Sequence, residues 1–358
     1  MAGHDRFPRD RFVTIHESRS DPEISVLMPL FEQEPFVSEA VASVLAQERV
    51  TCEVIVSDDA SSDATFARAL QTSQSIIESR TVPHRIVMRR GIDRLRRDHP
   101  PLLEEAASCD VVAHAHGDDV SRPDRARSLL DALESTGAAL AFSAIDIVDE
   151  RGRHVRQRGN LPSPRTVLTA EEILSEWGWP ILACEAWRRT PMAVFGRLDS
   201  SVAPEAHDQI LPFRAALIGG VVGIAEPLVA YRDHATNWNK SLADERTVAG
   251  FRVSLALTQV VCFDVMIRDL ERARTTALID EATYSSLGAV LGTVRAQRWN
   301  DLCESYREVV RSGRQALWVT EREMRLANEG KLAQRLADRA RWNPVLKKMK
   351  RLRKRWAR

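Results

Sequence analysis

The stretch "EISVLMPLFEQEPFVSEAVASVL" (Glu23–Leu45) changes from one hydrophobic pattern to another. Its first part, "EISVLMPLF" (Glu23–Phe31), is a short apolar run with β-branched residues, which predicts a buried strand. Beyond it, apolar residues recur at helical spacing, which predicts a helix; they are Val37, Ala40, Val41, Val44 and Leu45. A strand that leads directly into a helix is the beginning of an alternating α/β pattern.

The same alternation continues along the chain. Four further apolar runs predict strands: "CEVIVSDDASSD" (Cys52–Asp63), "RIVMRR" (Arg85–Arg90), "CDVVAHAH" (Cys109–His116) and "AALAFSAIDIVD" (Ala138–Asp149). Helical apolar spacing over Arg125–Ser135 separates the last two. Strands that alternate with helices predict a mostly parallel α/β sheet, and ligands of such sheets bind at the carboxyl ends of the strands.

Side chains suited to binding follow three of these strands. Phe31 ends the first, Asp58 with Asp59 the second, and Asp118 with Asp119 the fourth. Adjacent carboxylates repel each other unless they are solvated or neutralised by a cation, and Mg²⁺ and Mn²⁺ prefer carboxylate oxygens and substrate phosphates. The alternative for "GDDVSRP" is a helix-entry turn, in which a serine caps the helix and the proline lies in its first turn.

In their order and spacing, "ISVLMPLFEQEPFVSEAVASVLAQE", "EVIVSDDASSD" and "CDVVAHAHGDDVSRPDR" resemble the nucleotide-sugar-binding half of family 2 glycosyltransferases with the GT-A fold. The resemblance covers residues 23 to 241. It implies a Rossmann-like, mostly parallel central sheet flanked by helices. It also implies an inverting enzyme that moves a sugar from a nucleotide-diphosphate sugar to a hydroxyl of a glycan or lipid-linked acceptor in cell-surface polysaccharide synthesis.

The resemblance assigns donor-binding roles residue by residue. Pro29 and Phe31 fall where the family's first loop meets the nucleotide base, and Phe31 takes the place of a common tyrosine; the alternative for Phe31 is a core aromatic. Asp58 and Asp59 match the acidic pair that contacts base and ribose, the alternative being a turn capped with serines. Arg96 or Arg97 lies near a basic position that faces the nucleotide, the alternative being that these arginines form a solvated surface.

The family's metal motif, D-x-D, falls on His116 and Asp118, so this chain offers H-x-D-D. The resemblance therefore implies Mn²⁺ or Mg²⁺ held by Asp118 and Asp119. A neutral imidazole at His116 can bond a ribose hydroxyl or bind a softer metal. "YRDHATNWNKS" is similar to the family's closing motif, in which His234 completes the metal shell or contacts the diphosphate and Arg232 pairs with the diphosphate.

The acceptor side is implied by "CEAWRRTPMAVFGRLDSSVAPEAHDQILPFRAAL", where the usual acidic pair reads His207–Asp208. Asp208 would be the general base that takes the proton of the acceptor hydroxyl. Two alternatives remain open: Asp208 caps a helix, or Glu205 is the base. Aromatic side chains at Trp177 and Trp179 could stack on acceptor sugar rings, or they could belong to the core.

The chain is expected to divide into four parts: a flexible arm over 1–20, the GT-A domain over 21–245, a helical region over 246–336 and a basic amphipathic tail over 337–358. Arg339–Arg358 holds ten Lys or Arg and no acid, with apolar residues at helical spacing. Such a helix suits an anionic membrane surface, which would place the protein in the cytoplasm at the inner membrane face. The alternative is that the tail packs on its own chain or on a second copy in a homo-oligomer.

Other classes of protein are less compatible with the sequence. Five scattered cysteines without a CxxC pair argue against a disulfide framework or a zinc site. We find no apolar run of about 18 residues that would span a membrane and no recognisable nucleic-acid-binding module. A catalytically impaired, sugar- or nucleotide-binding scaffold stays open because His116 replaces an acid. Hydrolysis of a nucleotide sugar with added Mn²⁺ would distinguish an active transferase from such a scaffold.

Overall fold

The structure is a computed structural model and describes residues 7–95, 99–159, 161, 163–175, 182–197, 207–237 and 248–311. Two compact units make up the chain. The first joins Met1–Val194 to Ile218–His234, and the second joins Phe195–Leu217 to Ala235–Arg358. The segment Phe195–Leu217, which we expected within the sugar-transfer domain, therefore groups with the C-terminal region.

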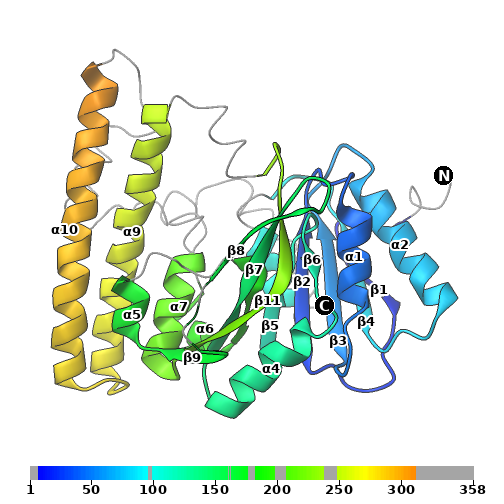
Figure 1. Ribbon diagram of the computed structural model, residues 1–358, viewed down its shortest axis with the longest axis horizontal. Helices are drawn as coiled ribbons and strands as arrows, with labels where there is room; N and C mark the ends of the chain where they lie inside the picture. The colour runs from blue at the N-terminus through cyan, green and yellow to red at the C-terminus, as the bar shows by residue number, and fades with distance from the viewer. Residues whose placement is uncertain are drawn as a thin grey trace. The chain divides into compact units, whose positions relative to one another are not determined.

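One mixed sheet forms the centre of the first unit (Figure 1). Its strands are β1 (Phe12–His16), β2 (Ile24–Leu30), β3 (Cys52–Asp58), β4 (Arg85–Arg90), β5 (Val111–His114), β6 (Val120–Ser121), β7 (Leu140–Asp149), β8 (His154–Arg158), β9 (Arg165–Leu168), β10 (Glu185–Arg188) and β11 (Val221–Asp233). The order is β1-β4-β3-β2-β5-β10-β7-β11-β6, with β8 paired to β7 and β9 to β11. The neighbours β4, β3, β2 and β5 are parallel, so their carboxyl ends share one edge. This confirms the predicted α/β class.

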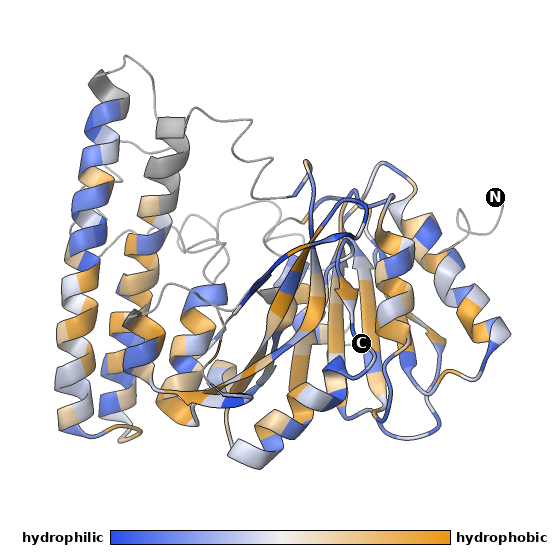
Figure 2. Ribbon diagram, in the orientation of Figure 1, coloured by the Kyte–Doolittle hydropathy of each residue, from blue (hydrophilic) through white to orange (hydrophobic). Residues whose placement is uncertain are grey.

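Helices α1 (Val37–Leu45), α2 (Thr65–Ser79), α3 (His99–Ala106) and α4 (Arg125–Thr136) connect these strands, and shorter segments follow at α5 (Ala170–Ser175), Leu182–Cys184 and α6 (Thr190–Phe195). The five apolar residues that predicted α1 are all buried in it. They pack in one core cluster with the central strands, whose residues are predominantly hydrophobic (Figure 2). Burial of these side chains, each worth about 1.5–3 kcal/mol, holds the helices to the sheet.

The first twenty residues, expected to form a flexible arm, contain a strand. β1 pairs antiparallel with β4 and extends the sheet at its edge. Asp10, just before it, forms an ion pair of 2.5 Å with the buried guanidinium of Arg89. The polar and charged residues around this short segment favoured an arm, although Phe12, Val13, Thr14 and Ile15 are residue types that are enriched in strands.

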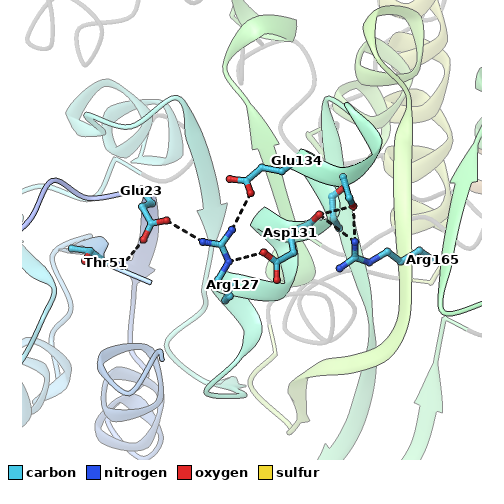
Figure 3. A network of polar contacts seen from close by, with 8 residues as sticks. Glu23, Thr51, Arg127, Asp131, Glu134 and Arg165 are labelled. Atoms are coloured by element: carbon cyan, nitrogen blue, oxygen red, sulfur yellow. Dashed lines mark hydrogen bonds and ion pairs between the residues drawn. The ribbon is translucent and has the colours of Figure 1, made fainter. Parts of the chain in front are cut away.

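A surface network fastens α4 to the opposite, amino end of the parallel strands (Figure 3). Arg127 donates to Glu23, Asp131 and Glu134. Arg165 of β9 donates to the backbone oxygen of Asp131. Exposed pairs of this kind contribute about 0–1 kcal/mol each, so they align the helix more than they stabilise the fold.

The second unit contains α7 (His207–Ile218), α9 (Val248–Thr275) and α10 (Glu281–Arg311). Arg214 of α7 holds both carboxylate oxygens of Asp269 in α9, at 2.7 and 3.2 Å. Arg295 of α10 binds Asp264 of α9 at 2.5 Å. None of the helices in the described ranges is long and apolar enough to cross a membrane. The predicted basic tail over 337–358 lies outside these ranges.

Candidate metal and nucleotide site

Three polar loops meet at the carboxyl edge of the central strands. Leu30, the last residue of β2, lies beside Asp58, the last residue of β3, and its carbonyl accepts the N–H of Asp59 at 2.9 Å. On the other side of β2, the N–H of Ala115 donates to Leu27 at 2.9 Å, just after the end of β5. The loops that follow β2, β3 and β5 are therefore neighbours, as the strand order requires.

The acidic pair after β3 is buried rather than solvated. Asp58 and Asp59 are 1% and 3% exposed. Ser61 donates its N–H to Oδ2 of Asp58 at 3.0 Å, and Leu95 donates its N–H to Oδ1 of Asp59 at 2.6 Å. Within the described residues, Oδ1 of Asp58 is buried without a hydrogen-bond partner. Burial raises the pKa of Asp58, although both hydrogen bonds with Ser61 oppose the rise. A buried carboxylate oxygen without a donor is suited to accept one from a ligand.

Phe31 is half-buried at the end of β2, next to the half-buried Pro29. The guanidinium of Arg94 lies 3.5 Å from the centre of the Phe31 ring. Arg96, the basic residue expected at this position, lies outside the described residues. Arg94 was not among the predicted site residues, because "GIDRLRRDHPP" offers three arginines and the spacing does not choose between them. The hydrogen bond from the adjacent Leu95 to Asp59 places Arg94 over the ring.

In the loop after β5, the space beside Gly117 is filled by the side chains of Leu30 and Gln33, from β2 and the loop after it. A Cβ added to Gly117 would lie 2.4 Å from both Oε1 of Gln33 and Cδ2 of Leu30. That Gln33 oxygen also faces the N–H of Phe31, at 3.3 Å. Gly117 therefore permits the acidic loop to pack directly against the loop that carries Phe31.

His116, Asp118 and Asp119 form a cluster that could hold a metal ion. Each offers a ligand atom, and these atoms lie within 4.8 Å of one another. Asp119 is 5% exposed, and its buried Oδ2 has no hydrogen-bond partner among the described residues and lies 3.6 Å from Nδ1 of His116. Two carboxylates and an imidazole suit a divalent ion such as Mn²⁺. The residues present therefore fit the expected metal, and His116 lies among them.

The end of β11 is joined to this acidic loop. The backbone N–H of Arg232 donates to Oδ1 of Asp119 at 2.9 Å, and its Nε donates to the carbonyl of Asp118 at 3.0 Å. Its remaining nitrogens reach Glu39 of α1, at 2.7 Å, and the carbonyl of Glu150, at 3.1 Å. The guanidinium expected to meet a diphosphate is thus 4% exposed and already binds protein groups. The bond to Glu39 could not be read from the sequence, since the two residues are 193 positions apart.

His234 follows β11 and is also buried. Its Nε2 lies 3.1 Å from Oδ2 of Asp118, and its ring packs 4.6 Å from the ring of Phe36. The structure thus brings His234 into contact with an expected metal ligand. This contact fixes the orientation of the Asp118 carboxylate.

The pKa values of the adjacent acids Asp118 and Asp119 are shifted in opposite directions. Burial pushes the pKa of Asp118 upward, but the hydrogen bond with His234 and the charges of His116 and His234 outweigh it, so that pKa lies below its usual value. Burial raises the pKa of Asp119, and the charge of Asp118 adds to the rise against the influence of His116. A divalent cation between them would favour the ionised form of both.

The expected acceptor-side residues are only partly described. Asp208 lies in the first turn of α7, within the second unit, and is half-buried. Glu205, Trp177 and Trp179 lie outside the described residues. The first-turn position of Asp208 agrees with either of the roles considered for it, because acids at a helix N-terminus are favoured by the dipole.

The family model described as "Glycosyl transferase family 2" matches residues 25–187. Over 137 residues the chain is 31% identical to the succinoglycan biosynthesis protein ExoO of Rhizobium meliloti (strain 1021); the match covers 38% of this chain and 36% of that protein. Over 254 residues it is 22% identical to the uncharacterized glycosyltransferase alr2836 of Nostoc sp. (strain PCC 7120), covering 69% of this chain and 76% of that one. The chain thus spans little more than a third of the length of the first of these relatives.

Among solved structures, the fold is similar to that of S. aureus TarS 1-349, crystallised with UDP. The TM-score is 0.53 at 13% sequence identity, and the match covers 74% of this chain and 69% of that one. At this identity the likeness concerns the fold alone. The GT-A fold expected from the sequence motifs is thereby confirmed.

Proposed function

We propose that this chain, whose residues 25–187 match the model of glycosyl transferase family 2, transfers a sugar from a nucleotide-diphosphate sugar to a hydroxyl of a glycan or lipid-linked acceptor. The observation that carries the proposal is the convergence of the Asp58, Phe31 and Asp118 loops at one edge of the sheet. Two of these loops carry a buried carboxylate oxygen, on Asp58 and Asp119, that has no hydrogen-bond partner among the described residues. The UDP in the TarS crystals supports a nucleoside-diphosphate donor.

On the donor side, Phe31 offers a ring for the base and Asp58 an acceptor for a base or ribose donor. Arg94, already stacked on Phe31, is the described basic residue nearest to that ring. His116, Asp118 and Asp119 would hold Mn²⁺ or Mg²⁺, which supplies positive charge to the diphosphate as it leaves. His234 orients Asp118, and Arg232 fastens the acidic loop to β11. In this proposal, His234 and Arg232 act by positioning the acidic loop, and not by direct contact with the metal or the diphosphate.

On the acceptor side, Asp208 is the proposed general base. It would take the proton of the acceptor hydroxyl as the oxygen attacks the anomeric carbon on the face opposite the diphosphate. The new bond to carbon forms as the bond to the diphosphate oxygen breaks, which inverts the configuration. A role in polysaccharide synthesis at the cytoplasmic membrane face is supported by the name of the succinoglycan relative and by the basic tail.

A thermal-shift panel of nucleotide sugars, with and without Mn²⁺, tests the donor assignment. A ligand present at 100 times its dissociation constant should add about 2.7 kcal/mol of stability. We expect one base to stand out, and only with the metal. A chain that no nucleotide sugar stabilises would contradict the proposal, and binding without any sugar hydrolysis or transfer would indicate a scaffold.

The base assignment is tested with Asp208→Asn, which keeps the shape of the side chain and removes its basicity. Turnover should fall on the order of a hundredfold or more, with donor affinity little changed. Asp301→Asn is the matched control, since this carboxylate lies on α10 and binds Arg298 at 3.1 Å. Near-normal turnover of Asp208→Asn, measured by product release, would transfer the role to Glu205 or to a substrate group.

A further inference from the structure

The β7–β8 hairpin carries a concentration of positive charge that the proposed chemistry does not use. Residues 151–158 read "RGRHVRQR", with four arginines, one histidine and no acid. Every residue of β8 is exposed. In the described part of the sheet, β8 pairs only with β7 (Figure 1). Its outer edge therefore offers backbone and side-chain donors to solvent.

Some of this charge is neutralised locally and some is not. Arg153 binds Asp149 at 2.7 Å, and Nε2 of His154 lies 3.3 Å from Asp146. Arg156 and Arg158 form no ion pair with any described residue, in contrast to Arg127, which contacts three carboxylates. Arginines on an edge strand can serve simply to discourage pairing with another chain.

The register of the sheet connects these arginines to the candidate site. Arg156 lies opposite Ile147 of β7, and Ile147 lies beside Tyr231 of β11. Paired residues share a face, so Arg156 and Tyr231 stand on the same side of the sheet, about 10 Å apart between Cα atoms. Arg158, two residues on, stands in the next row on that face, about 6.8 Å from Arg156.

Tyr231 in turn lies beside the proposed metal ligands. Tyr231 follows Ala230 of β11, which pairs with Val120 of β6, and Val120 directly follows Asp119. Because the two strands are antiparallel, the backbone of Tyr231 lies beside that of Asp119. One face of the sheet thus runs from the acidic loop, across Tyr231 and the buried Ile147, to Arg156 and Arg158.

We propose that Arg156 and Arg158 bind a phosphate or diphosphate group of the acceptor, and that β8 guides this acceptor toward the donor site. The guanidinium fork matches phosphate geometry, and two forks on one face suit a group that carries two negative charges better than a single carboxylate. The inference rests on the proposed function and adds the chemical class of the acceptor. The same chemistry is present in the donor diphosphate, so the test separates the two sources.

The test uses the full chain and the double variant Arg156→Gln/Arg158→Gln. The matched control is Arg19→Gln/Arg49→Gln, which removes two exposed arginines near the amino ends of β2 and β3, at the edge opposite the site. Calorimetry with Mn²⁺ first identifies which of UDP, GDP, CDP and ADP binds. It then measures the binding of inorganic pyrophosphate to protein saturated with that nucleoside diphosphate. A second series without nucleotide measures pyrophosphate alone, and a third measures the nucleoside diphosphate.

We expect the wild type and the control to bind pyrophosphate in addition to the nucleotide, and the β8 variant to bind it about tenfold or more weakly. Nucleoside diphosphate affinity should be equal in all three proteins. Three outcomes would overturn the inference: no additional pyrophosphate site in the wild type, equal losses in variant and control, or weaker nucleoside diphosphate binding by the β8 variant, which would assign the arginines to the donor. Failure of every nucleoside diphosphate to bind would instead refute the proposed function, while the series without nucleotide still reports on β8.

Discussion

Gly91 shows how the absence of one side chain shapes the donor site. Its N–H donates to the carbonyl of Asp58 at 2.9 Å. A Cβ there would lie 2.7 Å from that oxygen and 3.0 Å from the backbone nitrogen of Ala60. Both contacts are with backbone atoms, which cannot rotate away as a side chain could. The turn that presents Asp58 would have to move.

Gly91→Ala should therefore lower stability by about 1–3 kcal/mol, the usual range for overpacking, and should weaken nucleoside diphosphate binding. Calorimetry and thermal unfolding check the two effects. Gly292→Ala is the control, because a Cβ at this helical position meets nothing within 4 Å. It should be neutral or stabilising by up to about 1 kcal/mol, with unchanged binding. Equal nucleotide affinity in Gly91→Ala and the wild type would show that the turn does not shape the site.

At the residue scale, the acids could be predicted and their partners could not. Asp58, Asp59, Asp118 and Asp119 were located from the sequence because each follows an apolar run that had to be a strand. Arg94 was missed because its stacking depends on the rotamer of one exposed arginine among three. The contact of Arg232 with α1 was missed for a different reason: it forms only when β11 and α1 come together in the fold.

Helix α3 joins the sheet through a buried histidine. His99, its first residue, is 3% exposed, and its Nε2 lies 2.7 Å from Oγ of Ser57 in β3. Burial lowers the pKa of His99 to about 3, and the nearby Arg89 adds to the decrease. The imidazole is therefore neutral in the folded protein over the whole range in which an exposed histidine becomes charged.

The neutral, buried His99 determines how the stability of the protein changes with pH. Between pH 6.5 and about 3, the unfolded chain binds a proton at this histidine and the folded chain does not, so acid favours unfolding. The contribution of His99 is complete above pH 6.5 and declines by up to about 1.4 kcal/mol per pH unit below it. Urea unfolding from pH 4 to 7 gives the free energy of unfolding of the wild type and of His99→Gln at each pH. The slope of this free energy against pH should correspond to about one proton fewer in the variant. Parallel curves would mean that His99 is protonated in the folded state.

At the element scale, burial decided which strands the sequence could reveal. β2, β3 and β7 appear as apolar runs because most or all of their residues are buried. β1 and β8 are five residues long and have no fully buried residue, so neither appears as a long apolar run, although Val13, Thr14 and Ile15 of β1 are β-branched. Edge strands are held by backbone pairing with a neighbour, and a pattern of side chains does not record that pairing.

At the scale of the whole molecule, the segment around α7 could not be assigned from local patterns. One contact that joins it to α9 is the Arg214–Asp269 pair, whose residues lie 55 positions apart. The role of the C-terminal tail is predicted from its amino-acid composition alone. Ten basic residues interleaved with tryptophans predict affinity for an anionic surface, with about 1 kcal/mol for each basic residue near it.

We expect the full chain to bind vesicles that contain anionic lipid at low salt, and a chain truncated after Leu336 not to bind them. Sedimentation with vesicles measures both, and neutral vesicles are the control. Added salt should release the full chain, since the attraction is screened over about 10 Å at 0.1 M. Equal sedimentation of the two chains, or binding indifferent to lipid charge, would show that the tail packs on protein.

The central claim is that the acidic loop after β5 binds a nucleoside diphosphate through a divalent metal. Calorimetric titration of the preferred nucleoside diphosphate, with and without Mn²⁺, into wild type and Asp118→Asn tests it most directly. Asp110→Asn, an exposed acid that binds Arg188 at 3.5 Å, is the control. We predict that Mn²⁺ tightens binding to the wild type and the control about tenfold or more, and that Asp118→Asn loses this gain while it stays folded. The same Mn²⁺ dependence in Asp118→Asn and the wild type would contradict the account.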